Sequence, residues 1–303
     1  MTNAPMTESA PDPPSPANLA PVVLVLGKGG VGRTTVAAGL AVLAAGTQGR
    51  AAYVEFGDGA SGRRALAGAP RGIEHLVIRS ADALQRAAAS LFGSSLLARL
   101  ALGNFAMRPL VRVAPAVREV AVLEAVRQVA AERPGVRVVV DMPATGHSVA
   151  WLRLPRQGLE FLGPGPVREF CARLASELLA PARSSIVVVT LPERLVLEET
   201  RELCASIAQE AGLAVDRVAV NRLPVGLPPE ALEAARALAR RPGAVGIAAT
   251  ALAGILEGRD AAAAEARAAL AVIGQRAVWR LPEAPHDPPA REVAAWLRDE
   301  GAA

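Results

Sequence analysis

Residues 22–35, VVLVLGKGGVGRTT, decide the fold, because five apolar residues run directly into a glycine-rich loop that is followed by a helical pattern. Glycines let backbone N–H groups curl around phosphate oxygens, and the start of the following helix adds about half a positive charge. The spacing from Gly27 to Thr34 matches the phosphate-binding loop G-x-x-x-x-G-K-[ST], in its strand-to-helix context, except at Arg33. The stretch therefore predicts nucleotide-binding ancestry.

Arg33 stands where the motif has lysine, and a guanidinium group is larger, planar and differently directed than an ammonium group. The loss of a well-placed charge-assisted hydrogen bond costs about 1.5–3 kcal/mol. Arg33 therefore weakens the prediction of hydrolysis more than the prediction of nucleotide binding. The hydroxyl of Thr34 is expected to bind Mg²⁺. The residues expected to contact the nucleotide in this loop are Gly27, Lys28, Gly29, Gly30, Val31, Gly32, Arg33, Thr34 and Thr35.

The charge composition is unusual, because Lys28 is the only lysine among 33 lysine and arginine residues. A lone lysine in this background marks a position where arginine does not serve. The net charge is +4, but the arginines are scattered and interleaved with glutamates, so we expect no nucleic-acid partner. Aromatic residues make up only 3% of the chain, too few for platforms that stack single-stranded bases.

Cysteine usage and apolar run lengths indicate a cytoplasmic protein. Cys171 and Cys204 are far apart and no CxxC motif occurs, so neither a zinc site nor a disulfide framework is expected. Residues 1–20 contain five prolines and no basic residue, and are expected to form a disordered tail rather than a secretory signal. Runs such as Val36–Ala45 fall short of the roughly 20 residues that a membrane span requires, so no integral membrane segment is expected.

Short β-branched runs alternate with alanine- and leucine-rich helical patterns over residues 21–303. Nearly continuous apolar strands are typical of a parallel sheet covered by helices on both faces. The alternation predicts one α/β domain, a doubly wound, mostly parallel sheet of the P-loop NTPase type. The expected strands are Val22–Leu26, Ala51–Phe56, Val136–Val140, Ser185–Thr190, Arg217–Val220 and Ala277–Leu281, and the expected helices include Thr34–Ala45, Arg194–Ala211 and Arg291–Leu297.

The alternation is interrupted between residues 81 and 133, where we expect a helical subdomain inserted into the α/β frame. Only helical segments are indicated there, separated by Gly93, Gly103, Pro109 and Pro115. Two interpretations of its apolar residues stay open, a self-contained helical core or a groove for an apolar partner segment. These residues are Leu91, Phe92, Leu96, Leu97, Leu100, Leu102, Phe105, Met107 and Leu110.

Four stretches resemble the ArsA-type anion-transporting ATPase family, which includes arsenite-pump and tail-anchored-protein-targeting ATPases. They are GKGGVGRTT at 27–35, RVVVDMPATGHSVAWLRLP at 137–155, IVVVTLPERLVLEETREL at 186–203 and VAVNRLP at 218–224. The first resembles the family's deviant phosphate loop with a signature lysine, KGGxGK[ST], and the second its D-[TM]-[AP]-x-T-G-H block. The resemblance covers about residues 20–300, and the short insert is similar to that of the bacterial branch.

The resemblance implies a dimeric ATPase that uses ATP and Mg²⁺. It implies that Lys28 reaches phosphate in the opposing subunit and stabilises transition-state charge. It also implies that Asp141 holds Mg²⁺ through water, and that Gly146 and His147 sense the γ-phosphate and pass the change to the next helix.

On the base side, the resemblance implies that Asn221 reads the adenine while the loop at Pro282 and Glu283 closes the pocket. Simpler interpretations remain open for three of the implied residues. Asp141 could cap the next turn, His147 could be hydrogen-bonded within a loop, and Asn221 could be a turn former after a strand.

Two alignments place the catalytic carboxylate after the second strand at different positions. The family places an aspartate there to orient the attacking water, and residues 54–61 of this chain read VEFGDGAS. Aligned from the downstream ALAG, Asp58 occupies that position, whereas Gly57 does when the alignment starts from the strand. Because such a carboxylate acts within hydrogen-bond reach, one residue matters. We favour Asp58, with Glu55 as a distant alternative.

Three functions follow from these residues. The leading one is an ArsA-type ATPase, a homodimer or a heterodimer with an ArsA-type paralogue, that couples closure to an apolar protein cargo or partner on the helical insert. The second, motivated by Arg33 and by the open position of the carboxylate after the second strand, is a hydrolysis-impaired pseudo-ATPase subunit that pairs with an intact paralogue. The third, a ParA/MinD-like positioning ATPase, is disfavoured by the TGH block. Arsenite transport is disfavoured because soft metalloids require clustered thiolates.

Overall fold

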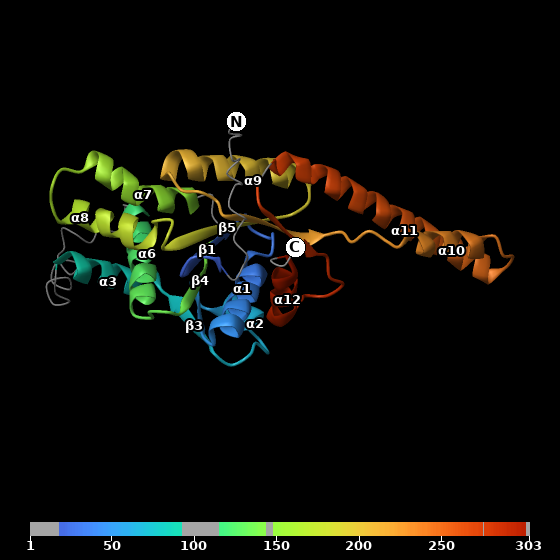
Figure 1. Cartoon of the computed structure of the whole chain (residues 1–303), viewed down its shortest axis with the longest axis horizontal. Coiled ribbons are helices and arrows are strands. Elements are labelled where there is room, and N and C mark those ends of the chain that lie inside the picture. Colours follow the sequence, from blue (N-terminus) through green and yellow to red (C-terminus); the bar gives the residue numbers. More distant parts are fainter. Residues whose placement is uncertain (1–17, 93–114, 144–147, 275, 301–303) are drawn as a thin grey trace, which may run out of the picture.

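A computed structural model describes residues 18–92, 115–143, 148–274 and 276–300 of the protein (Figure 1). In this part of the chain, seven parallel strands form one sheet in the order β3-β2-β4-β1-β5-β6-β7. The predicted α/β class is confirmed. The strands are β1 Val22–Gly27, β2 Ala51–Phe56, β3 Ile73–Ile78, β4 Arg137–Asp141, β5 Ser184–Thr190, β6 Arg217–Leu223 and β7 Val278–Pro282.

Helices follow most of the strands, including the three expected near 34–45, 194–211 and 291–297. None of the described helices is long and apolar enough to cross a membrane. The α-helices are α1 Arg33–Gln48, α2 Ala60–Ala65, α3 Ser80–Phe92, α6 Pro115–Ala131, α7 Ser148–Phe161, α8 Pro166–Arg173, α9 Arg194–Ser206, α10 Pro229–Ala239, α11 Ala244–Ala269 and α12 Ala290–Glu300. Short turns extend three of them, the π-helical η2 Leu174–Leu178 and η3 Ile207–Ala211 and the 3₁₀ η4 Leu270–Ile273.

Two layers of helices bury the faces of the sheet (Figure 1). Successive side chains of a strand point to opposite faces, so Val23 and Val25 of β1 enter one core while Leu24 and Leu26 enter the other. Helices α1, α2 and α12 pack on the first face, and α3, α6, α7, α8 and α9 pack on the second. This double burial explains why β1 is apolar throughout.

β3, whose sequence is IEHLVI, was not among the expected strands. Glu74 and His75 interrupt its apolar pattern, and most of its side chains are only partly buried. β3 lies at the edge of the sheet and pairs with β2. An edge strand tolerates charged side chains that a central parallel strand does not, so its sequence signal is weaker.

Helices α3 and α6 are the described parts of the expected insert at 81–133. Ala83 and Ala87 of α3 and Leu123 of α6 belong to the same buried cluster as the neighbouring strands. Leu91 lies in α3 and packs against this cluster. The apolar residues expected between 93 and 114 lie outside the described residues. The division into frame and insert therefore stays a prediction.

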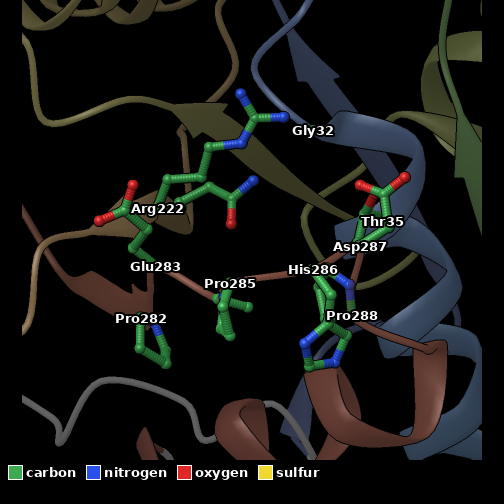
Figure 2. A pocket seen from close by; sticks show the side chains of 11 residues that line it. Gly32, Thr35, Arg222, Pro282, Glu283, Pro285, His286, Asp287 and Pro288 are labelled. Atoms are coloured by element: carbon green, nitrogen blue, oxygen red, sulfur yellow. The ribbon is translucent and has the colours of Figure 1, made fainter.

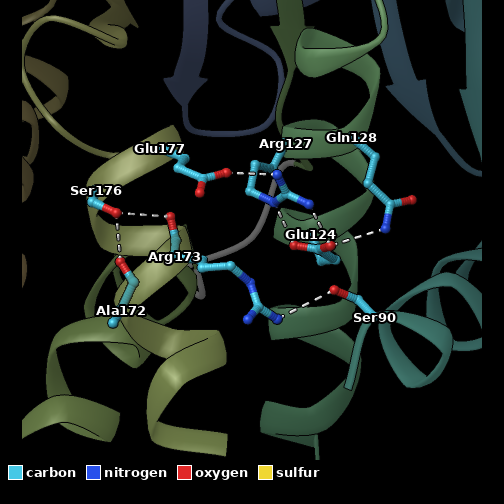
Figure 3. Close-up of polar contacts among 8 residues, drawn as sticks. All are labelled: Ser90, Glu124, Arg127, Gln128, Ala172, Arg173, Ser176 and Glu177. Carbon is cyan, nitrogen blue, oxygen red and sulfur yellow. Dashed lines mark hydrogen bonds and ion pairs between the residues drawn. The ribbon is translucent and has the colours of Figure 1, made fainter. Parts of the chain in front are cut away.

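A buried ionic network fastens α6 to η2 (Figure 3). Glu124 of α6 has no exposed surface, and its carboxylate accepts hydrogen bonds from Arg127 at 2.8 and 2.9 Å and from Gln128 at 2.9 Å. Arg127 also donates to Glu177 of η2 at 2.7 Å. Because every charge in the network has a partner, the buried carboxylate is tolerated next to an apolar core.

Between β6 and β7 the chain forms a hairpin of α10 and α11, which projects from the body of the molecule (Figure 1). α10 packs against the N-terminal part of α11. This projection was not anticipated from the sequence, because alanine-rich helical periodicity does not indicate where a helix points.

Replacing Glu124 by glutamine should lower the free energy of unfolding by about 1–3 kcal/mol at neutral pH, because a buried charge-assisted hydrogen-bond set is weakened. Burial alone raises the pKa of Glu124, but the hydrogen bonds from Arg127 and Gln128 outweigh it and leave the pKa below its ordinary value. The carboxylate thus stabilises the fold above its unfolded pKa of about 4.3, and this contribution is lost as pH falls through the lower folded pKa.

Denaturant titrations at neutral pH and below about pH 4 measure both effects. Acidification should cost the wild type more stability than it costs Glu124→Gln. The control is Glu177→Gln, at a half-exposed position, which should change stability by less than about 1 kcal/mol. Equal losses in the two variants would contradict the prediction.

Candidate functional site

The loop between β1 and α1 has a backbone that requires glycine. Gly30 and Gly32 have φ angles of 84° and 85°, in the left-handed region. Gly27 lies so close to β5 that an added Cβ would sit 2.6 Å from the backbone oxygen of Val189. An added Cβ on Gly32 would collide with the amide nitrogen of Asn221. The loop is therefore packed tightly between β5 and the end of β6.

Helix α1 begins at this loop without a capping side chain. Gly32 occupies the N-cap, makes no side-chain hydrogen bond, and is followed by a first turn with no acidic residue. The first N–H groups of an α-helix lack acceptors within the helix and carry about half a positive charge. Together with the glycine loop, they form a site suited to a phosphate group.

Asp141, at the end of β4, is the central acceptor of the site. Thr34 donates from Oγ1 to Oδ2 at 2.6 Å, Tyr53 donates from its hydroxyl to Oδ2 at 3.2 Å, and Arg33 donates from Nε to Oδ1 at 3.1 Å. The carboxylate is buried. β1 and β4 pair in parallel, with Val25 opposite Asp141, so the loop and this carboxylate meet at one edge of the sheet. The two expected Mg²⁺ ligands, Thr34 and Asp141, thus lie together.

The side chain of Arg33 is held on two sides by protein groups. Its Nη1 donates to the carbonyl oxygen of Gly27 at 3.0 Å, in addition to the contact of Nε with Asp141. Only 11% of the side chain is exposed. The lysine position of the motif is therefore filled by a cation that is already paired with a carboxylate.

Tyr53 is a site residue that the sequence analysis missed. Burial, with the nearby carboxylates of Asp141 and Glu55, raises the pKa of Tyr53 well above its ordinary value, so the hydroxyl stays protonated and donates to Asp141. Its only signal in the sequence is that it is the single tyrosine of the chain, inside an expected strand.

Lys28 lies at the surface of the loop, 57% exposed, and forms an ion pair with Glu199 of α9. An ion pair at such an exposed position contributes about 0–1 kcal/mol. The signature lysine, Lys28, therefore pairs with a carboxylate of its own chain. Another anion could readily replace that carboxylate.

The carboxylates after β2 contact α2 and β3. Asp58 accepts a hydrogen bond from the backbone N–H of the residue two positions later, at 2.9 Å, and so caps the start of α2. Glu55 is buried, accepts a hydrogen bond from the N–H of Gly62 at 2.9 Å and lies 2.6 Å from Nε2 of His75. Gly57 has a φ of 103°. The choice of a water-orienting position among Asp58, Gly57 and Glu55 stays a prediction.

A cavity of about 400 Å³ adjoins the loop at the ends of β6 and β7 (Figure 2). Asn221 ends the regular part of β6, where the register with β7 shifts and Arg222 has a φ of 54°. The Asn221 side chain donates to the carbonyl oxygen of Val31 at 2.9 Å and so joins the cavity to the loop. The cavity is lined by Gly32, Thr35, Asn221, Arg222, Pro282, Glu283, Ala284, Pro285, His286, Asp287 and Pro288.

Asn221 and Pro282, both expected on the base side, thus line one cavity together. The cavity is also lined by three residues that were not expected from the sequence, Arg222, His286 and Asp287. A proline-rich segment directly after the last strand was the available signal, but it does not indicate the direction in which that segment folds.

A second cavity, of about 490 Å³ and almost wholly apolar, lies among α3, α6, α7 and α8. Leu91 of the expected insert lines it, together with Val117 of α6 and Leu154 of α7. At its rim, Phe161 is 80% exposed and Val167 is 52% exposed. This is the described part of the region in which a partner groove was expected.

Gly146 and His147, the expected γ-phosphate sensors, lie outside the described residues. Cys171 and Cys204 are buried, and burial raises the pKa of both thiols, so they are protonated. Within the described residues, no group of three or more His, Cys, Asp or Glu side chains could hold a metal ion.

A parallel sheet of this order, with a glycine-rich loop between β1 and α1, defines a protein of the P-loop NTPase class. No family model matches the chain. ATPase BagA of Mycobacterium tuberculosis is 30% identical to it over 232 residues, covering 69% of this chain and 67% of BagA. Mb3704 of Mycobacterium bovis matches with the same identity and coverage. The chain belongs to the family of these mycobacterial proteins and is a distant homologue of the ATPase BagA.

Gly32→Ala should weaken nucleotide binding about tenfold or more. An alanine at this φ costs about 1–2 kcal/mol, and its Cβ would displace Asn221 from the loop. Isothermal titration with a non-hydrolysable ATP analogue measures the change. The matched control is Gly46→Ala in α1, where an added Cβ has no neighbour within 4 Å and binding should match the wild type. Unchanged affinity in Gly32→Ala would show that the loop does not hold the nucleotide.

Proposed function

We propose that the protein is an ATP-binding ATPase of the ArsA type, with the deviant phosphate loop of that family. One observation carries the proposal, namely that Gly32 begins the phosphate site beside Asp141 and also borders the cavity lined by Asn221. A single nucleotide requires a phosphate site and a base pocket that adjoin each other. In open α/β sheets, ligands bind beyond the carboxyl ends of strands where the strand order reverses, and β1 lies at that point, between β4 and β5.

The residues at this edge fit a magnesium nucleotide. The loop N–H groups and the start of α1 would bind the phosphates, the Thr34 hydroxyl would bind Mg²⁺, and Asp141 would hold the ion through water. When bound, Mg²⁺ supplies positive charge that neutralises the phosphate oxygens during transfer. Tyr53 would keep the Asp141 carboxylate in its orientation, and Asn221 and Pro282 would contact the base.

The proposal includes a dimer, either of this chain with itself or with an ArsA-type paralogue. Lys28 is exposed at the loop and is paired only weakly with Glu199, so it could exchange this partner for the phosphate of an opposing subunit. Lysine suits this role better than arginine because its ammonium group is compact and its stem is slender.

Coupling to an apolar protein cargo is supported by the cavity among α3, α6, α7 and α8. Exposed apolar surface of this kind marks interaction sites in soluble proteins. α7 begins directly after the predicted γ-phosphate sensors and contributes Leu154 and Phe161 to the cavity, so a change at the nucleotide could reach it through one helix. Cys171 and Cys204 form no disulfide in the described part of the chain, which suits a reducing cytoplasm.

Lys28→Ala should lower Mg-ATP turnover by about 10- to 100-fold, because one charge-assisted contact with the transferred phosphate is lost. Lys28→Arg should not restore it, because the guanidinium group is larger and planar. The surface variant Arg194→Ala serves as the control and should keep wild-type turnover. Steady phosphate release is the measurement. Turnover that is insensitive to Lys28→Ala would contradict the mechanism, and absence of ATP binding by the wild type would contradict the function.

A second candidate function is a hydrolysis-impaired subunit that binds nucleotide and regulates an intact paralogue. The observation that favours it is the contact of Arg33 with Asp141 and with the Gly27 carbonyl. In this position the guanidinium neutralises the Asp141 carboxylate, which would otherwise face Mg²⁺. Its positive charge is therefore directed at Asp141 and not at the phosphates.

Arg33→Lys distinguishes the two functions, because a lysine restores the motif and cannot bridge the same two acceptors in a plane. For a hydrolysis-impaired subunit, turnover should be barely measurable in the wild type and should rise by about tenfold or more in the variant. Arg64→Lys, on the exposed side of α2, is the control and should change nothing. Efficient turnover by the wild type alone, with no gain in Arg33→Lys, would eliminate this candidate.

A further inference from the structure

The hairpin of α10 and α11 leaves most of α11 without cover from the described part of the chain (Figure 1). α10 packs along one side of α11, where Gly246, Ala249 and Ala253 are buried. The side that carries Ile247, Ala251 and Ile255 faces away from α10. This uncovered surface of α11 lies apart from the nucleotide loop and from the apolar cavity at α3.

Large apolar side chains stand on the uncovered part of α11. Ile247 is 76% exposed, Ile255 62%, Val245 56% and Leu252 46%. No charged residue occurs from position 244 to 256. Soluble monomers rarely expose an apolar surface that is continuous over several helical turns, so this surface indicates a binding partner.

We propose that this surface binds a second copy of the chain, with the two α11 helices antiparallel and crossing at Ala251. A two-fold interface must be self-complementary, because the same residues face each other from both copies. Ile247 lies four positions before Ala251, and Ile255 lies four positions after it. In an antiparallel crossing, Ile247 of one copy therefore meets Ile255 of its partner, and Ile255 meets Ile247. Beside them, Gly254 and Gly258 border open space, because a Cβ added to either glycine would meet nothing within 4 Å. Each copy therefore has a hollow there that accepts an isoleucine of its partner.

Charges at the two ends of this surface are complementary in the same arrangement. Arg240 and Arg241 lie in the turn before α11, eleven and ten positions before Ala251, and Glu265 lies fourteen positions after it, on the face of α11 that carries Ala251. Within the described residues, none of these three side chains has an ion pair. An antiparallel crossing places the arginines of one copy near the Glu265 carboxylate of the other.

The charge distribution favours a protein partner over a lipid surface. A helix that lies on a membrane has lysine and arginine along its polar side and large aromatic residues on its apolar side. The polar positions of this hairpin include both signs, with Glu230, Glu233, Arg236 and Glu257, and the hairpin contains no aromatic residue. Arg236 and Glu257 pair with each other across the two helices at 2.7 Å.

This interface is separate from the nucleotide-dependent dimer proposed above. It requires neither Lys28 nor ATP, and it predicts association of the nucleotide-free protein. Together, the two interfaces would allow each copy to bind one neighbour through the loop and another through the hairpin.

Sedimentation velocity of the full chain without nucleotide tests the proposal. The wild type should form dimers as its concentration rises, and Gly254→Leu should weaken them by about 10- to 100-fold by filling the hollow. The monomer tolerates this change, because the site has open space and leucine is a better helix former than glycine. The matched control is Gly46→Leu in α1, which also has open space and should associate as the wild type does.

Disulfide trapping tests the crossing point. Ala251→Cys lies on the two-fold axis, where the small residues allow the helices to approach to about 8 Å, and should form a cross-linked dimer on mild oxidation. Ala234→Cys, exposed on α10 away from the crossing, should not. Both native cysteines are buried, so they should add little background.

Charge reversal tests the orientation. Glu265→Arg should weaken association, and the added change Arg241→Glu should restore it, whereas parallel helices would show no such rescue. A monomeric wild type at all concentrations would overturn the proposal. So would association that depends on ATP and Lys28 but not on Gly254, or binding to anionic phosphatidylserine vesicles without self-association.

Discussion

A buried carboxylate requires hydrogen-bond donors, and the site of this protein is arranged around the donors to Asp141. They come from Arg33 and Thr34 at the start of α1 and from Tyr53 in β2. These elements converge because β4 lies between β1 and β2 in the sheet. The same contacts hold the start of α1 against the sheet, and thereby place Gly32 next to the cavity at the end of β6.

The two cations of the loop differ in their surroundings in a way that matches their chemistry. Arg33 is nearly buried and bridges a carboxylate and a carbonyl oxygen, which a planar group with several donors does well. Lys28 is exposed and has a weak partner in Glu199, which suits a group that must change partners. A chain that uses arginine at every other cationic position has kept lysine where a slender, exposed ammonium group is available to a ligand or a neighbour.

Much of the frame could be predicted because central parallel strands are apolar on both faces, as β1 and β5 are. The meeting of Thr34 with Asp141 could be expected too, because strand ends of a parallel sheet lie at one edge. Tyr53 could not be assigned to the site, since its contact with Asp141 spans 88 positions and depends on the strand order. The edge strand β3 was missed because it has one neighbouring strand and partly buried side chains, so its sequence need not be apolar throughout.

The chemistry at the loop follows from local sequence: glycines where φ is positive, one lysine, and an arginine in place of the motif's lysine. Local spacing is sufficient for this, because a strand, a tight turn and a helix start are formed by neighbouring residues. The packing of distant elements sets the contact of Arg33 with Asp141 and the exposure of Ile247 and Ile255 on α11. Both outcomes depend on which elements pack together, and alanine-rich helices have nearly the same sequence whether a neighbour covers them or not.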